Sequence, residues 1–156
     1  MSDPIYIRIG EIEENKTAYE KGESARRIFD LMVDRSNGDR ETMHLILLSA
    51  KNDIIGIELH ALGTLNRADI HLREIVKSVI LKNAAALVLV HNHPSGDPEP
   101  SFDDRASTKL VADAMHLIGC TFLDHLIIGA RRFGRNDYFS FSDHGAAELK
   151  GSGGAQ

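Results

Sequence analysis

Apolar residues recur at helical spacing in three segments of the chain, and each stripe predicts an amphipathic helix. The first helix is expected from Ser24, a plausible N-cap, to about Asp34. The second covers residues 72–80, and the third covers residues 102–118 and ends at Gly119, a residue type that favours helix termini. The residues expected to face the core are Ala25, Ile28, Phe29 and Met32 in the first helix, Leu72, Ile75, Val76, Val79 and Ile80 in the second, and Leu110, Val111, Ala114, Met115 and Ile118 in the third.

Aliphatic and β-branched runs predict strands around these helices. Residues 43–48 and 54–59 flank a turn and read as a hairpin. Residues 85–90 carry no polar side chain, which predicts a central strand covered on both faces. Residues 122–128 and 138–141 complete the sheet. Because strands and helices alternate, the predicted fold class is α/β, with a mixed sheet flanked by helices.

The chain has 156 residues, which suits a single domain, and no internal repeat is visible. Residues 1–22 are polar apart from the run Ile5-Tyr6-Ile7, and we interpret them as an N-terminal arm or edge strand. Residues 23–146 form the predicted domain. Residues 147–156 are expected to be a disordered tail, because their last seven positions are small and glycine-rich.

Composition narrows the class of protein. Hydrophobic residues make up 42% of the chain and charged residues 26%, as in ordinary globular domains. No window approaches about 20 consecutive apolar residues, so no membrane span is expected. The start lacks the basic and apolar segments of a secretory signal, and Cys120 is the only cysteine, so a cytoplasmic protein is expected. A net charge of −5 argues against non-specific nucleic-acid binding by the whole surface.

The polar loop after the all-apolar run carries the candidate chemistry. His91 and His93 are two positions apart at a strand end, so their imidazoles point to the same side in extended backbone. Asp104 follows in the first turn of the next predicted helix, and the prolines between them restrict the loop. Two imidazoles and a carboxylate would leave one tetrahedral position for water, as in catalytic zinc sites.

Each part also has a simpler explanation. Histidines near a loop can be surface residues, and Ser101-x-x-Asp104 can be only a helix N-terminus, since serine caps helices and early acids favour the helix dipole. The intervening residues can be ordinary turn chemistry. The metal interpretation is favoured because one geometry accounts for all these residues together.

The spacing His91-x-His93-x(7)-Ser101-x-x-Asp104 resembles the JAMM motif of the MPN-plus (JAB) metalloproteases. The strings from His91 to Asp97 and from Leu123 to Gly129 resemble the RadC branch of that family, and Gly63-Thr64-Leu65 and Arg73-Glu74 also fit it. The resemblance covers roughly residues 24–146. It implies the MPN/JAB (cytidine-deaminase-like) architecture and a Zn²⁺ ion held by His91, His93 and Asp104.

The resemblance also implies a zinc-dependent hydrolase that cleaves an amide or isopeptide bond in a peptide or protein-conjugate substrate. The family's water-activating glutamate is best matched by Glu58, with Glu74 as a weaker substitute, and Ser101 is expected to donate a hydrogen bond to the oxyanion. Carboxylates often orient metal-bound histidines, and the candidates for this role are Asp97, Asp103 and Asp124.

His125 belongs to the family's Asp124-His125 pair, but apolar residues flank that pair, so a hydrogen-bonded core histidine is an equal alternative. The sequence departs from the family in two respects. Full-length RadC proteins usually carry a helix-hairpin-helix region that residues 1–22 cannot encode. Leu72 also stands where the family usually has proline.

Two other function classes stay open. A DNA-repair-associated accessory protein has local support only from Arg131, Arg132 and Arg135 around Phe133, and a solvated hairpin turn is the favoured explanation of that cluster. A non-catalytic metal-binding module is the second, because a fold alone does not settle function. The residues indicate no particular substrate and no oligomeric state.

Overall fold

The computed structural model describes residues 24–35, 39–63, 70–129 and 137–152. The elements follow the order α1 (Ser24–Met32), β1 (Thr42–Leu48), β2 (Ile54–Leu62), α2 (Leu72–Leu81), β3 (Ala86–Asn92), α3 (Phe102–Ile118), β4 (Thr121–Ile128) and β5 (Tyr138–Ser140), with a short 3-10 helix, η2 (Ala147–Leu149), at the end. Apart from η2, these are the helices and strands that the sequence predicts.

The strands form one mixed five-stranded sheet in the order β2-β1-β3-β4-β5. β1 pairs antiparallel with β2 and β3, β3 and β4 are parallel, and β5 is antiparallel to β4. The parallel pair requires a crossover, which α3 supplies. The predicted α/β class and mixed sheet are therefore confirmed, and the architecture is consistent with the JAB/MPN fold.

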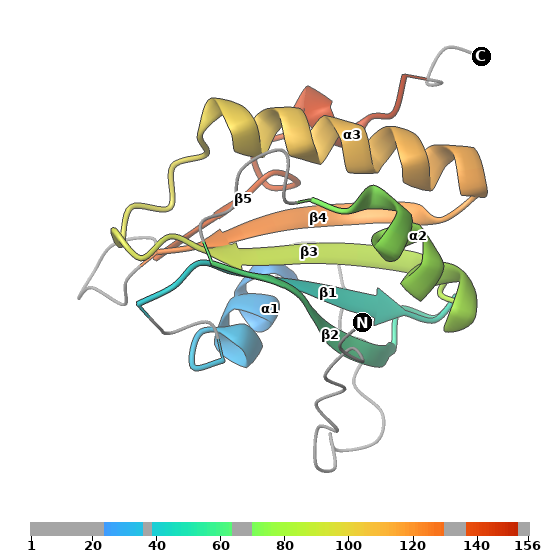
Figure 1. The fold of residues 1–156 in the computed structure, drawn as a ribbon, viewed down its shortest axis with the longest axis horizontal. Helices are drawn as coiled ribbons and strands as arrows, with labels where there is room; N and C mark the ends of the chain where they lie inside the picture. Colours follow the sequence, from blue (N-terminus) through green and yellow to red (C-terminus); the bar gives the residue numbers. More distant parts are fainter. Residues whose placement is uncertain (1–23, 36–38, 64–69, 130–136, 153–156) are drawn as a thin grey trace.

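Two apolar layers enclose the sheet (Figure 1), with α1 on one face and α2 and α3 on the other. All seven residues of β3 are buried, as its uninterrupted apolar run predicts. Alternate residues of β3 point to opposite faces, so Val88 and Val90 pack in the α1 layer while Leu87 and Leu89 pack beneath α2 and α3. The residue that follows in the second series is His91, which therefore emerges on the α2/α3 face.

The predicted boundaries differ from the observed ones at a few positions. α1 begins at Ser24 itself, one position earlier than an N-cap at Ser24 requires, and it ends at Met32 instead of about Asp34, in a turn in which Arg35 donates to the Met32 carbonyl. β2 extends to Leu62. The predicted arm at residues 1–22 lies outside the described residues. Among the described residues, no helix combines the length and apolar character needed to cross a membrane.

Residues 147–152, which the sequence analysis assigns to the tail, pack along α3 in the structure. Arg105 of α3 forms an ion pair with Glu148 at 3.1 Å, and the backbone N–H of Ser152 donates to Asp113 at 2.6 Å. Gly151 lies so close to α3 that a Cβ there would meet the Cβ of His116 at 2.9 Å. Small residues permit this approach, so the same composition that suggests disorder allows close packing here. Residues 153–156 lie outside the described part of the chain.

The loop after β3 is held against the end of β4. His93 donates its backbone N–H to the Ile128 carbonyl at 2.8 Å. A Cβ at Gly129 would stand 2.5 Å from the Gly96 carbonyl oxygen and 2.9 Å from Cδ of Pro98. Glycine at this position therefore lets the loop approach the sheet.

We expect Gly129→Ala to destabilise the protein by about 1–3 kcal/mol, because the methyl group displaces backbone that cannot give way easily. Gly56→Ala is the control, since a Cβ there would meet only Cδ1 of Leu47 at 3.7 Å, an ordinary contact. Urea unfolding of both variants measures the difference. Equal midpoints for Gly129→Ala and Gly56→Ala would show that the loop is not tightly held.

Candidate metal centre

His91, His93 and Asp104 converge where β3 ends and α3 begins. One ligand atom from each residue lies within 4.8 Å of the other two, and no other such group of three occurs among the described residues. The Nε2 atoms of the two histidines are 3.0 Å apart. His91 Nε2 lies 3.1 Å from Oδ1 of Asp104, and His93 Nε2 lies 3.3 Å from Oδ2. These residues therefore form a group that could hold a metal ion.

The group is buried on one side and open on the other. The His91 side chain is only 2% exposed, whereas those of His93 and Asp104 are 14% and 16% exposed. This gradient follows from the fold, since His91 continues a buried strand while the other two lie on the loop and the helix end. Among the described residues of the group, His93 and Asp104 are the ones that a small molecule or ion can reach from solvent.

The Asp104 carboxylate is strongly anionic in this setting. Burial alone would raise its pKa, but hydrogen bonds from His91 and His93 outweigh burial and hold the pKa well below its usual range. For His93, burial lowers the pKa, yet its hydrogen bonds to Asp104 and to the Asp97 carbonyl dominate and the pKa is raised. The Asp104 carboxylate is therefore ionised and suited to bind a cation.

Ser101 and Asp104 form a reciprocal cap at the start of α3. The Ser101 hydroxyl accepts from the Asp104 N–H at 3.1 Å, and the Asp104 carboxylate accepts from the Ser101 N–H at 2.7 Å. This capping box confirms the capping interpretation of Ser101 and fixes the Asp104 side chain. A hydroxyl that accepts one hydrogen bond keeps its proton for donation, so the oxyanion role of Ser101 stays a prediction.

Neither His91 nor His93 has a carboxylate as the hydrogen-bond partner of its Nδ1 atom. His93 Nδ1 donates to the backbone carbonyl of Asp97 at 2.8 Å, and His91 Nδ1 contacts His125 Nε2 at 2.7 Å. Of the three predicted carboxylates, that of Asp97 accepts from the Glu99 N–H instead, and Asp103 is exposed in the first turn of α3. The expectation that a carboxylate orients these histidines is therefore wrong.

Asp124 lies on the other face of the sheet. It pairs with Val88, which packs in the α1 layer, while its neighbour His125 pairs with Leu89 beneath α3. Adjacent strand residues point to opposite faces, so only one member of the Asp124-His125 pair can reach His91. The Asp124 carboxylate accepts hydrogen bonds from the Ser140 hydroxyl at 2.6 Å and the Ser142 N–H at 2.9 Å.

His125 is both a core histidine and a neighbour of the candidate metal centre, the two interpretations that the sequence left open. Its ring is fully buried and stacks on Phe141 with centroids 5.1 Å apart, as a core histidine would. Burial, and then the nearby His91, lower its pKa well below the ordinary value. It also contacts His91 and, at 2.6 Å, the Thr108 hydroxyl, so it belongs to the metal-centre surroundings. Thr108 was not predicted, although its position one helical turn after Asp104 places both on one face of α3.

Glu58 lies on the same face of the sheet as His91. It is opposite Leu45, Leu45 is opposite Leu89, and paired strand residues share a face. Glu58 is buried, 6% exposed, and its carboxylate makes no hydrogen bond or ion pair among the described residues. It is not in the group of ligand atoms within 4.8 Å. The alternative, Glu74, is exposed on α2 with its carboxylate 3.5 Å from Lys77.

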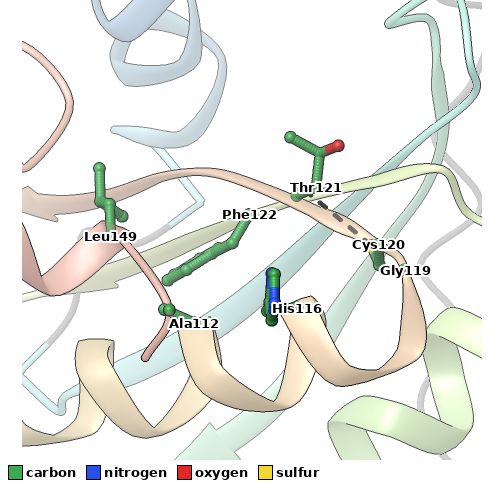
Figure 2. Close-up of a pocket in the computed structure, with 8 residues that line it drawn as sticks. Ala112, His116, Gly119, Cys120, Thr121, Phe122 and Leu149 are labelled. Atoms are coloured by element: carbon green, nitrogen blue, oxygen red, sulfur yellow. Dashed lines mark hydrogen bonds between the residues drawn. The ribbon is translucent and has the colours of Figure 1, made fainter. Parts of the chain in front are cut away.

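A hollow of about 440 Å³ lies towards the C-terminal end of α3, away from the candidate metal centre (Figure 2). Ala112 and His116 of α3 face Phe122 and Leu149 across it, and Cys120 lies at its margin. Burial raises the pKa of the Cys120 thiol to about 11, which leaves the thiol protonated at neutral pH and poorly nucleophilic. None of the candidate metal ligands lines this hollow. The predicted arginine cluster Arg131, Arg132 and Arg135 lies outside the described residues.

An α/β domain with a His-x-His strand end facing a capped helix carboxylate is a candidate metal-binding domain. Comparison with known proteins identifies its family. A family model described as RadC-like JAB domain matches residues 22–146. The chain is 40% identical over 121 residues to a UPF0758 protein from Symbiobacterium thermophilum, covering 77% of this chain and 50% of the relative. It is 46% identical over 109 residues to a UPF0758 protein from Moorella thermoacetica, covering 69% and 48%.

The chain therefore belongs to the RadC-like JAB domain family, as its motifs predicted. It spans about half the length of the curated relatives it matches. The names of these relatives state no activity, so family membership establishes the fold and leaves the reaction to be proposed.

The buried Asp124 gives a pH-dependent contribution to stability. Burial raises its pKa from 3.8 to about 6, so the folded state binds this proton more tightly than the unfolded state does. The stabilising contribution is therefore full below about pH 4 and is lost as the pH rises through about 6. We expect wild type to lose up to about 3 kcal/mol relative to Asp124→Asn between these pH values.

Urea unfolding across this pH range measures the effect, with Asp39→Asn at an exposed position as the control. The asparagine can keep both hydrogen bonds, with its oxygen accepting from Ser142 N–H and its amide donating to Ser140. Parallel pH profiles for wild type and Asp124→Asn would contradict the raised pKa.

Proposed function

We propose that this domain is a zinc-dependent hydrolase of the JAMM type that cleaves an amide or isopeptide bond in a peptide or protein-conjugate substrate. The observation that carries the proposal is the convergence of two imidazole nitrogens and one carboxylate oxygen within 4.8 Å, buried behind and open in front. This donor set is one that zinc prefers, and three protein ligands leave a position for water.

When bound, zinc would supply Lewis acidity that lowers the pKa of a water molecule towards about 7 and polarises the substrate carbonyl. His91, His93 and Asp104 would hold it. The His93 and Asp104 side chains are partly exposed, so a substrate would reach the metal from their side. Membership of the JAB domain family supports a hydrolytic reaction.

Glu58 is the proposed general base. It would accept a proton from the attacking water and return it to the leaving nitrogen, which balances the reaction because the amine leaves neutral. Its burial, its freedom from other hydrogen bonds among the described residues and its position on the face that carries His91 support this role. Ser101, at the exposed N-terminus of α3, would donate its hydroxyl proton to the oxyanion.

Zinc content and hydrolysis separate the parts of this proposal. We expect wild-type protein to bind about one zinc ion, as catalytic sites with three protein ligands do. His93→Ala should lose it, while His116→Ala, an exposed histidine of α3, should retain it. Glu58→Gln should retain zinc but lose about 10²–10⁴-fold in kcat/KM on a peptide or isopeptide substrate. Zinc-loaded wild type and Glu58→Gln with equal turnover would contradict the assignment of Glu58, and zinc binding without any turnover would favour a binding module.

Two substitutions at Ser101 separate capping from catalysis. Ser101→Ala should lower the free energy of unfolding by about 1 kcal/mol, whereas Ser101→Gly should lower it by only a few tenths, because glycine is tolerated at N-caps. Both remove the hydroxyl, so both should lower kcat by about 10²–10³-fold if Ser101 stabilises the oxyanion. Thermal unfolding and steady-state kinetics measure the two effects. Activity that follows stability across the pair would leave Ser101 with a capping role alone.

A further inference from the structure

A buried chain of hydrogen bonds connects the two ends of the candidate metal centre. Thr108 Oγ1 lies 2.6 Å from the backbone carbonyl oxygen of Asp104 and 2.6 Å from His125 Nδ1. His125 Nε2 in turn lies 2.7 Å from His91 Nδ1. The side chains come from α3, β4 and β3, and Thr108, His125 and His91 are all buried. Solvent therefore cannot substitute for a missing partner in this chain.

The direction of the chain follows from its first member. A carbonyl oxygen can only accept a hydrogen bond, so the single hydroxyl proton of Thr108 is committed to Asp104. The Thr108 oxygen must then accept from His125, which requires the His125 proton to be on Nδ1. Many helical threonines donate to the carbonyl one turn earlier. Thr108 also contacts His125 Nδ1, and this second contact determines which nitrogen of His125 is protonated.

His125 is neutral, because its ring is completely buried, stacks on Phe141 and contacts no carboxylate. With its one proton on Nδ1, its Nε2 carries a lone pair and accepts from His91. His91 therefore carries a proton on Nδ1. The other nitrogen of His91, Nε2, is the one that faces His93 and Asp104.

His91 and His93, the two candidate metal ligands, thus differ in how their tautomers are fixed. His93 Nδ1 donates directly to the Asp97 carbonyl, which can only accept, so that tautomer is set locally. His91 has an imidazole as its partner, and an imidazole can donate or accept. The contact between Thr108 and His125 determines that His125 accepts the hydrogen bond from His91.

We propose that Thr108 and His125 are positioning residues that keep His91 protonated on Nδ1, so that Nε2 is the only nitrogen able to present a lone pair to a divalent cation. The inference rests on the proposed zinc site for its consequence, but the direction of the chain is a property of the metal-free protein. Metal-bound histidines usually donate their second ring N–H to a fixed acceptor, and loss of such a partner lowers metal affinity by about 10–100-fold.

The test compares Thr108→Val, which removes the hydroxyl with little change in shape, with Thr108→Ser, which keeps it. In metal-free protein labelled with ¹⁵N-histidine, two-bond ¹H–¹⁵N correlation spectra near neutral pH report the protonated nitrogen of each ring. Wild type and Thr108→Ser should show His125 and His91 protonated on Nδ1. In Thr108→Val the His125 proton has no acceptor at Nδ1 and should move to Nε2, which turns the His91 contact around.

Zinc affinity, measured by competition with a chromophoric chelator, should fall about 10–100-fold in Thr108→Val and stay close to wild type in Thr108→Ser. A wild-type His125 protonated on Nε2, or wild-type zinc affinity in a folded Thr108→Val, would overturn the inference. If Thr108→Val does not fold, the wild-type spectrum decides alone. Failure of wild type to bind zinc would instead remove the proposed function, whichever tautomer is seen.

Discussion

The centre depends on one contact, that between a carboxylate at the start of α3 and two imidazoles at the end of β3. Asp104 is held by the Ser101 capping box, and its two oxygens each face one histidine. A helix N-terminus favours a negative charge, and the hydrogen bonds from the histidines hold the pKa of Asp104 well below its usual range. Asp104 is therefore a negative charge in a fixed position, facing two imidazole nitrogens. This arrangement of charge and donor atoms suits the binding of a cation.

The surrounding structure keeps these three side chains in register. β3 is buried over its whole length, so the position of His91 is set by core packing on both faces of the sheet. The loop to α3 is fixed by the backbone bond from His93 to Ile128 and by the close approach of Gly96 to Gly129. The strands and this loop hold the candidate ligands in place before a metal binds. These side chains would therefore lose little conformational entropy on metal binding.

The sequence predicted those features that depend on local pattern. The apolar run of β3, the helical stripe of α3 and the spacing from His91 to Asp104 are visible along the chain. They predicted the mixed sheet and the convergence of a candidate metal-binding group. Features that depend on register between distant segments were not predictable in this way. The contact from His91 to His125 requires β3 and β4 to pair in parallel with Leu89 opposite His125, and the packing of residues 147–152 requires contacts from Glu148 and Ser152 to α3.

The incorrect expectation about Asp124 shows where strand geometry adds to a motif. A motif places Asp124 and His125 together, but alternation along β4 sends one side chain towards α1 and the other towards α3. Since His91 lies on the α3 face, the histidine is the member of the pair that can contact it. A carboxylate in that place would put a second anion within the core next to Asp104, at a high desolvation cost. A neutral imidazole avoids this cost. Through Thr108, this imidazole also links the orientation of His91 on β3 to α3, the helix that carries Asp104, the candidate carboxylate ligand.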